Sequence, residues 1–266
     1  MLIWLTAGVR QIYPAEAGDA GLADAGLAAL YSYPDLGAAG SAPWLRANMV
    51  TSLDGAATLH GRAAGLSSEG DRQIFAMLRA LADVILVGAG TARAERYAPV
   101  RPETELQRWA WLREGRTPSP PIAVVTHRLG LDLDGALVAG APEHARTILI
   151  TTEAAPAARR AAAARTADVL VLGDASVDIP AALDALAKRG HRRILAEGGP
   201  HLLSEIACAD RLDELCLTVS PLLTGPGAGR IVQGAAPPDG TGPWPRSLAH
   251  VLAEEGYLFC RYLRPS

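Results

Sequence analysis

The sequence predicts an α/β fold built around one mixed sheet. Short apolar runs typical of buried strands alternate with segments of helical periodicity, and the last part of the chain is rich in strand-like runs. Repeated βα units followed by a β-rich tail favour one sheet over two domains, and no internal repeat or linker interrupts them. With 266 residues, 49% of them hydrophobic and 20% charged, the chain can bury a substantial core.

The first 42 residues differ from the rest because they are rich in Ala, Gly and Asp. Within them, Leu22, Leu27 and Leu30 form one short helical stripe, which a Tyr-Ser-Tyr-Pro segment follows. We therefore expect residues 1–42 to form an arm packed on the body, and residues 43–266 to form a single domain.

The body begins with βα units whose strands are apolar, as strands buried on both faces are. The expected strands of this part are residues 45–50, 83–87, 122–126, 147–151, 168–172 and 193–197. The expected helices are residues 71–81, capped by Ser67 or Ser68, and residues 156–165, 180–188 and 201–207. Residues 212–220 and 249–263 are expected to be late antiparallel strands, joined by a Gly/Pro-rich loop over residues 221–245.

Composition and charge argue against several functional classes. A net charge of -3, with scattered Lys and Arg, argues against nucleic-acid binding. Three cysteines without a C-x-x-C pair and six histidines without H-x-E or H-E-x-x-H argue against a disulfide framework and a metal centre. Residues 1–6 are too short for a signal sequence, and no run reaches the roughly 20 apolar residues of a membrane span. We expect a cytoplasmic protein that binds neither membranes nor metals.

Two glycine turns follow expected strands, where backbone N–H groups can approach an anionic ligand. The first, Gly88-Ala89-Gly90-Thr91, begins like the fingerprint G-x-G-x-x-G. Arg93 replaces the third glycine, however, and no acidic residue closes a second strand about 20 residues further on, so a standard dinucleotide-binding fold is not favoured. The second, Glu197-Gly198-Gly199-Pro200, precedes a helix whose N-terminus would attract a pyrophosphate. Taken alone, each turn is equally compatible with a tight connection.

A hydroxyl and a carboxylate stand at the end of the first strand of the body. Ser52 and Asp54 have the same side-chain parity, so both face one cleft if the strand continues that far. The alternative is an ordinary Asx turn before Gly55.

Four segments carry a more specific signal through their order and spacing: residues 52–55, 82–91, 197–200 and 212–221. Together they resemble the reductase domain of the bifunctional riboflavin-biosynthesis deaminase/reductase family, over roughly residues 43–263. No H-x-E with P-C-x-x-C precedes them, so the chain resembles a stand-alone pyrimidine reductase without the deaminase domain.

This resemblance implies a dihydrofolate-reductase-like, three-layer fold that binds NADPH and forms a homodimer. Its central sheet would be mixed and mostly parallel, with flanking helices and an antiparallel C-terminal part. The motifs carry over as cofactor-binding residues Gly88, Ala89, Gly90, Thr91, Gly198, Gly199 and Pro200. Thr126 and Arg128 stand where the family binds the 2′-phosphate of NADPH, although an exposed turn is the alternative there.

On the substrate side, the resemblance implies that Ser52 and Asp54 face the pyrimidine and sugar. Asp54 would protonate near the carbon that accepts hydride, and Glu197 is the rival catalytic carboxylate. Arg93 and Arg96 are candidates for binding the 5′-phosphate of the substrate, or alternatively surface residues. Residues 66–71 and 94–99 depart from the usual family pattern. This departure bears on the identity of the substrate more than on that of the cofactor.

The implied reaction is hydride transfer from NADPH to C1′ of a 5-amino-6-ribosylaminopyrimidine 5′-phosphate, which gives the ribitylamino product. A dihydrofolate- or pterin-type reductase is the alternative enzyme, because the implied fold is shared. A catalytically silent NADPH-binding regulatory protein is the alternative outside the enzymes.

Overall fold

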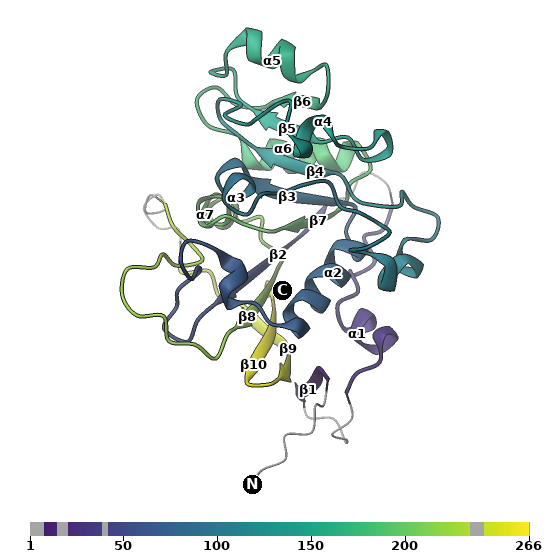
Figure 1. Cartoon of the computed structure of the whole chain (residues 1–266), viewed down its shortest axis with the longest axis vertical. Coiled ribbons are helices and arrows are strands. Elements are labelled where there is room, and N and C mark those ends of the chain that lie inside the picture. Colours follow the sequence, from purple (N-terminus) through teal and green to yellow (C-terminus); the bar gives the residue numbers. More distant parts are fainter. Residues whose placement is uncertain (1–7, 15–20, 39–41, 235–241, 266) are drawn as a thin grey trace.

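The strands form a single mixed sheet. The computed structural model describes residues 8–14, 21–38, 42–234 and 242–265. Its ten described strands have the order β1-β9-β10-β8-β2-β7-β3-β4-β5-β6 (Figure 1). From β8 to β6 all neighbours are parallel. These strands are β8 (Glu214–Val219), β2 (Trp44–Thr51), β7 (Arg193–Ala196), β3 (Val84–Gly88), β4 (Ile122–Val125), β5 (Ile148–Thr151) and β6 (Asp168–Val171).

The other end of the sheet is antiparallel and includes a strand from the arm. β10 (Tyr257–Leu263) pairs with β8 and with β9 (Ser247–Glu254), and β1 (Arg10–Tyr13) pairs with β9 at the edge. The expected strand over residues 249–263 is therefore wrong as one element, because it is a hairpin. Glu255 and Gly256 both have positive φ, 47° and 86°, which is the geometry of a tight two-residue turn. The edge strand β1 was not predicted.

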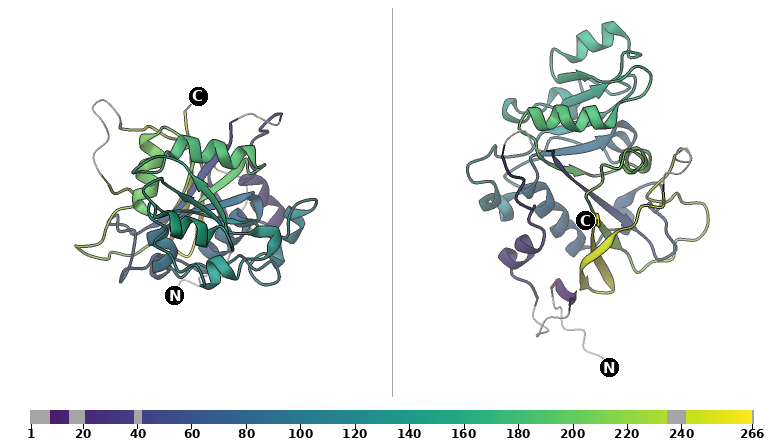
Figure 2. Two further views of the ribbon diagram at one scale, coloured as in Figure 1. Left: turned by 90° about the horizontal axis from the view of Figure 1, so that it is seen from above. Right: turned by 180° about the vertical axis from the view of Figure 1, so that it is seen from behind.

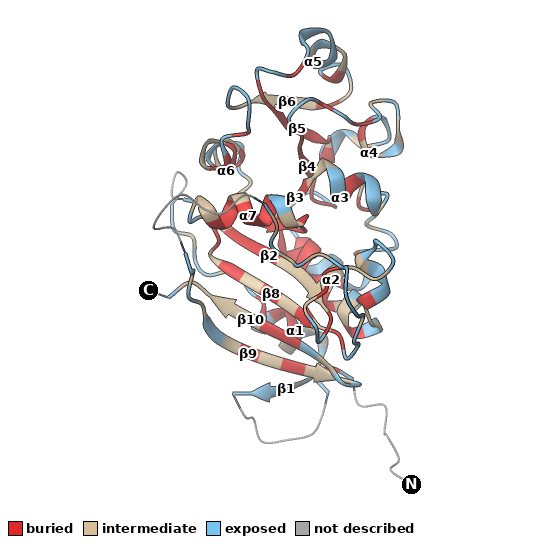
Figure 3. Ribbon diagram, turned by 90° about the vertical axis from the view of Figure 1, so that its left-hand side faces the viewer, coloured by how far each residue is buried: buried red, intermediate tan, exposed pale blue. Residues whose placement is uncertain are grey.

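Helices cover both faces of the sheet (Figure 2). α1 (Asp24–Leu30), α2 (Glu69–Leu81) and the 3₁₀ helix η2 (Gln107–Arg113) pack on one face, and α6 (Ile179–Lys188) and α7 (Pro200–Cys208) on the other. Side chains alternate along β3, so Ile85 and Val87 join the first core cluster while Val84 and Leu86 join the second. Burial concentrates in the central strands, and β1 is largely exposed (Figure 3). The expected three-layer, mixed α/β fold is confirmed.

The helix α2 shows how local sequence positions one wall of the site. Ser68 caps it by accepting a hydrogen bond from the backbone N–H of Asp71 at 3.1 Å, which satisfies one otherwise free donor. Its apolar side chains at helical spacing are buried against the sheet, and each contributes about 1.5–3 kcal/mol. These are Ile74, Met77, Leu78 and Leu81. The resulting orientation points Phe75 and Arg79 toward the carboxyl edge of the sheet.

The remaining helices are short. α3 (Ala89–Ala94) begins directly after β3, so the first glycine turn is in fact a strand-to-helix junction. The others are η1 (Ala63–Leu66), α4 (Ala136–Ala139), η3 (Glu143–Ala145) and α5 (Ala157–Ala163). Among the described residues, no helix is long and apolar enough to cross a membrane.

Candidate active site

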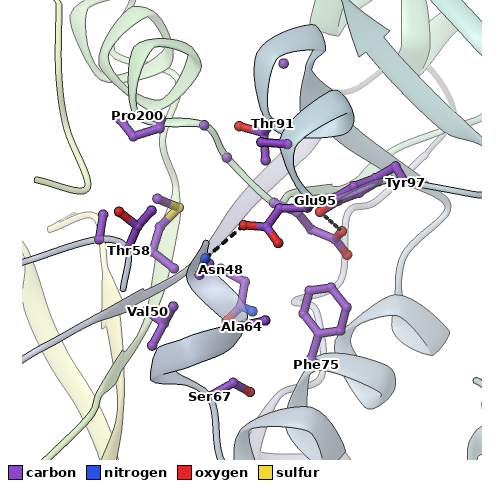
Figure 4. A pocket seen from close by; sticks show the side chains of 18 of the residues that line it. Asn48, Val50, Thr58, Ala64, Ser67, Phe75, Thr91, Glu95, Tyr97 and Pro200 are labelled. Carbon is purple, nitrogen blue, oxygen red and sulfur yellow. Dashed lines mark hydrogen bonds between the residues drawn. The ribbon is translucent and has the colours of Figure 1, made fainter. Parts of the chain in front are cut away.

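A cavity of about 730 Å³ opens at the edge of the sheet where the parallel strands end. Its walls come from β2 and η1, from α2 and α3, and from the junction between β7 and α7 (Figure 4). The carboxyl ends of β3 and β7 form its floor. This is the position at which parallel α/β sheets bind ligands.

The two glycine segments meet at this floor although they lie more than a hundred residues apart. The backbone N–H of Gly88 donates to the carbonyl of Gly198 at 2.9 Å. A Cβ atom on Gly199 would lie only 2.3 Å from Oγ1 of Thr91, so a side chain at this position would displace the Thr91 hydroxyl. Gly198 has a φ of 92°, in the region that favours glycine. Of the residues predicted in these segments, all but Ala89 line the cavity.

The N-terminus of α7 also opens into the cavity. Gly199 precedes the helix without a side-chain cap, and Pro200, His201 and Leu202 line the cavity. The first N–H groups of a helix have no partner within the helix, and the helix dipole places partial positive charge there. This end of α7 therefore suits a negatively charged group.

A buried ion pair forms another wall. Arg79 of α2 donates to both carboxylate oxygens of Glu197, through Nε and Nη2 at 2.8 Å each, and its Nη1 donates to Glu105 at 2.7 Å. The hydroxyl of Tyr97 donates to Glu197 Oε2 at 2.7 Å (Figure 4). Burial, and then the charge of Glu197, raises the pKa of Tyr97 well above its usual range, so the phenol keeps its proton. The oxygens of Glu197 are thus occupied by fixed donors.

Glu95 has more freedom than the other carboxylates of the cavity. Its Oε1 accepts a hydrogen bond from the backbone N–H of Ala63 at 2.8 Å, and its Oε2 makes no hydrogen bond to a residue that the structure describes. Asp71 instead accepts from Thr218 at 2.6 Å and from Ser67 at 2.5 Å, one on each oxygen. Glu95 is therefore the cavity carboxylate best able to contact a ligand.

Ser52 and Asp54 lie together but outside the residues that line the cavity. Ser52 is buried, accepts from the backbone N–H of Ala56 and donates to Asp54. Asp54 is exposed and also accepts from the backbone N–H groups of Thr224 and Gly225, the latter at 2.8 Å. The Ser52 hydroxyl, followed by the Thr224 backbone, holds the pKa of Asp54 well below its usual range. The carboxylate fastens the turn at residues 52–55 to the loop after β8.

The predicted basic residues are spread more widely. Arg96 lines the cavity, whereas Arg93 donates to the carbonyl of Gly130 at 2.6 Å outside it. Thr126 is buried just beyond β4, and Arg128 is exposed in the following turn. Gly88 pairs with Val125, so this turn follows the strand next to β3 at the same edge. Neither Thr126 nor Arg128 is among the lining residues.

Sequence reasoning missed Arg79, Glu95 and Tyr97. A signal for Arg79 was present, because it is the single charge within the apolar segment of residues 74–82. A buried arginine requires an anion, and Glu197 ends a buried strand without a partner nearby in sequence. Within the described ranges, no group of three His, Cys, Asp or Glu residues could hold a metal ion.

Comparison with known proteins agrees with the motifs. The family model described as the RibD C-terminal domain matches residues 43–246. A relative from Archaeoglobus fulgidus is 30% identical over 184 residues, which are 69% of this chain and 82% of the relative. A relative from Aquifex aeolicus is 32% identical over 180 residues, which are 65% of this chain and 75% of the relative. Both are named 2,5-diamino-6-ribosylamino-4(3H)-pyrimidinone 5′-phosphate reductase.

Solved structures show the same relationship. A pyrimidine reductase-like protein from Corynebacterium diphtheriae superposes with a TM-score of 0.73 at 25% identity, covering 84% of this chain and 92% of that chain. RibD of Acinetobacter baumannii shares the fold, with a TM-score of 0.66 at 19% identity, covering 85% of this chain and 59% of that chain. The expected resemblance to the pyrimidine reductases of riboflavin biosynthesis is confirmed, and this chain belongs to the RibD C-terminal domain family.

Proposed function

We propose that this chain is an NADPH-dependent reductase that converts the ribosyl group of a phosphorylated ribosylaminopyrimidine to ribityl. The substrate that we favour is 2,5-diamino-6-ribosylamino-4(3H)-pyrimidinone 5′-phosphate, which the names of the relatives specify. The observation that carries the proposal is the contact between Gly88 and Gly198, which joins two glycine segments at the floor of one large cavity.

The residues around this floor fit a dinucleotide. Gly90 has no heavy atom within 4 Å of the position that a Cβ would take, so its backbone borders open space. The free N–H groups at the start of α7 can bind the pyrophosphate, with Gly88 and Thr91 on the other side and Ala89 behind them, outside the lining. Beyond β4, we expect Thr126 and Arg128 to bind the 2′-phosphate, because the Arg128 side chain is exposed and makes no hydrogen bond or ion pair with a described residue. When bound, NADPH supplies the hydride.

The protein side of the reaction consists of orientation and one proton. Hydride adds to C1′ of the ring-opened imine, the C1′–N π electrons move to nitrogen, and nitrogen takes a proton. We propose that Glu95 delivers this proton, because one of its oxygens faces the cavity without a partner among the described residues. Glu197 holds Arg79 and Tyr97 in place, and Arg96 binds the substrate phosphate. Ser52 and Asp54 position the neighbouring loop, and Arg93 holds the loop at Gly130.

The decisive experiment follows NADPH oxidation with purified protein and three additions: the diaminopyrimidinone phosphate, dihydrofolate, or buffer alone. The proposal expects oxidation only with the pyrimidine, together with a ribitylamino product. Turnover of dihydrofolate alone would favour the pterin-type alternative. NADPH binding without any substrate-dependent oxidation would favour a silent regulatory protein.

Two carboxylate substitutions separate the possible proton donors. Glu95→Gln should lower kcat by about 100-fold and leave the Kd for NADPH unchanged, since general acids contribute roughly 10²–10⁴-fold. Asp54→Asn should change stability more than kcat, because its oxygens bind the loop. The reverse pattern would make Asp54 the acid. Glu143→Gln, at an exposed position of η3 outside the cavity, is the control.

We also propose that the protein acts in the cytoplasm as a homodimer. Sedimentation velocity of the intact chain measures the oligomeric state. A monomer at micromolar concentration would remove this part of the proposal and leave the reductase assignment standing.

A further inference from the structure

A second cavity, of about 680 Å³, lies at the opposite edge of the sheet, where β3 and β7 begin. Its described walls are the end of α2, the end of η2 with the segment after it, the turn between α6 and β7, and arm residues 32–37. It shares no lining residue with the reaction cavity. Its volume lies within the range typical of small-molecule sites. The proposed reaction leaves this cavity without a role.

The described lining is strongly basic. It contains two aspartates and five arginines: Asp35, Asp83, Arg113, Arg116, Arg189, Arg192 and Arg193. Asp83 is fully engaged, because one oxygen accepts from Arg116 at 3.2 Å and lies 3.3 Å from Arg193 Nε. Its other oxygen accepts the backbone N–H groups of Arg192 and Arg193. Arg189 has its own partner outside the lining, Asp168 at 3.1 Å. The other four arginines therefore carry more positive charge than the two aspartates can neutralise.

Arg113 has no anionic partner among the described residues, and Arg116 shares Asp83 with Arg193. Arg113 donates to the carbonyls of Ala80 and Ala82 at 3.0 and 2.8 Å, and Arg116 donates to the carbonyl of Ala80 at 2.8 Å. These contacts satisfy the end of α2 but bring no negative charge. Burial, and then the charge of Arg116, lowers the pKa of Arg113 to about 10. The guanidinium groups therefore repel one another, and an anion would relieve that repulsion.

Hydrogen-bond donors remain available in the same walls. The terminal nitrogens of Arg193 make no hydrogen bond to a described residue, and its side chain is 38% exposed. The two terminal nitrogens of Arg192 donate to the carbonyls of Gly37 and Leu36, whereas its Nε and the Tyr33 hydroxyl are buried without a hydrogen-bond partner among the described residues. Arginine presents paired N–H groups that match the oxygens of phosphate. We propose that this cavity binds the phosphate group of a small phosphorylated molecule, with Arg193 and Arg192 as its main ligands.

Occupancy should stabilise the protein as well. Arg192 already joins the arm to the turn before β7, because it donates to the carbonyl of Gly37 at 3.0 Å. Because ligand that binds only the folded state raises the free energy of unfolding, the Tm should rise with ligand concentration.

The test uses the full chain saturated with NADPH, and inorganic pyrophosphate as the probe in isothermal titration calorimetry. Wild type should bind pyrophosphate, and Arg193→Gln should weaken that binding by at least about tenfold, as expected for a charged hydrogen bond. Arg211→Gln is the matched control, because it removes the same charge from an exposed pair with Asp184. No binding by wild type at millimolar pyrophosphate, or equal binding by wild type and Arg193→Gln, would overturn the proposal.

A second measurement needs no substitution. Arginine Nε–Hε NMR signals of the wild-type protein are followed during titration with pyrophosphate. Shifts of the Arg192 and Arg193 signals support the second site. Shifts confined to Arg72 and Arg96, which line the reaction cavity, would overturn it. Neither experiment depends on turnover, so this site can fail while the proposed reductase activity holds.

Discussion

Two buried arginine–glutamate networks in this protein use the same chemistry in different surroundings. Arg79 and Glu197 form a pair beside the reaction cavity. Arg46 and Glu214 form a pair beneath the N-terminal arm, where both side chains are 0% exposed and Nε lies 2.7 Å from Oε1. Arg261 also pairs with Glu214 at 2.7 Å. We call these pairs, with their direct partners, the open and the closed network.

The closed network joins the arm to the sheet. Arg46 donates to the carbonyl of Tyr31 at 2.7 Å, Arg261 to that of Leu30 at 2.5 Å, and the Trp44 indole to Glu214 at 3.0 Å. Arg46, Arg261 and Glu214 line neither cavity, and their partner Ser32 lines only the second one. A buried ion pair alone therefore marks a structural node. The open network differs in bordering the reaction cavity, into which the N-terminus of α7 also opens.

The largest expected effect is on the closed network. Glu214→Ala leaves two buried guanidinium groups without their anion, which should cost about 3–5 kcal/mol of unfolding free energy. Urea unfolding measures the loss, and Asp184→Asn in an exposed pair should cost at most about 1 kcal/mol. Equal losses in the two variants would contradict the distinction between buried and exposed pairs.

The closed network should also respond to acid. His250 packs edge-on against Tyr31 with ring centroids 4.8 Å apart, and burial, followed by the charge of Arg261, lowers its pKa from 6.5 to about 4. The unfolded chain therefore takes up the proton first, so stability falls as the pH drops from about 6.5 to about 4 and His250 contributes no further loss below that. The loss should reach about 3 kcal/mol. Urea unfolding at pH 7 and pH 4 measures this change in the free energy of unfolding. His250→Phe should lose less stability between the two pH values than wild type, and an equal loss would show that His250 is not its source.

On the open network, the expected effect is catalytic. Glu197→Gln should lower kcat/KM by about 100-fold, or about 2.7 kcal/mol, because Arg79 and Tyr97 lose their fixed acceptor. Arg79 keeps Glu105 as a partner, so the fold should survive. Steady-state kinetics and circular dichroism check both points. If Glu197→Gln kept wild-type kinetics, the open network would have a structural role only.

A smaller effect is expected at the far end of the cofactor site. Arg128→Gln should raise the KM for NADPH by about tenfold and leave that for NADH unchanged, since only NADPH carries the 2′-phosphate. Arg101→Gln, also at an exposed position but outside both cavities, is the control. A parallel rise for both cofactors would mean that Arg128 acts on the fold.

Much of the fold was predictable because strand and helix patterns are local. The apolar run before Gly88, the Ser68 cap and the stripe of Ile74 and Leu78 all appear as the sequence predicts. The edge strand β1 was not predictable, since its four residues are mostly exposed and carry no periodic signal. The site was predicted at the two glycine segments, where short motifs determine the backbone.

The rest of the site depends on contacts between distant residues. Arg79 meets Glu197 across 118 positions, and nothing local to either residue identifies its partner. Asp54 also depends on a distant partner. Its side-chain parity with Ser52 predicted only that the two residues share a cleft. The loop that Asp54 binds lies 170 positions away, and strand parity carries no information about that loop.

The reductase proposal requires one NADPH molecule to lie between the segments at Gly88 and Gly198. A crystal structure of the complex with NADPH would show its position. We expect the pyrophosphate between Gly90 and the N-terminus of α7, with the nicotinamide directed toward Glu95. NADPH bound away from either glycine segment would rule this arrangement out.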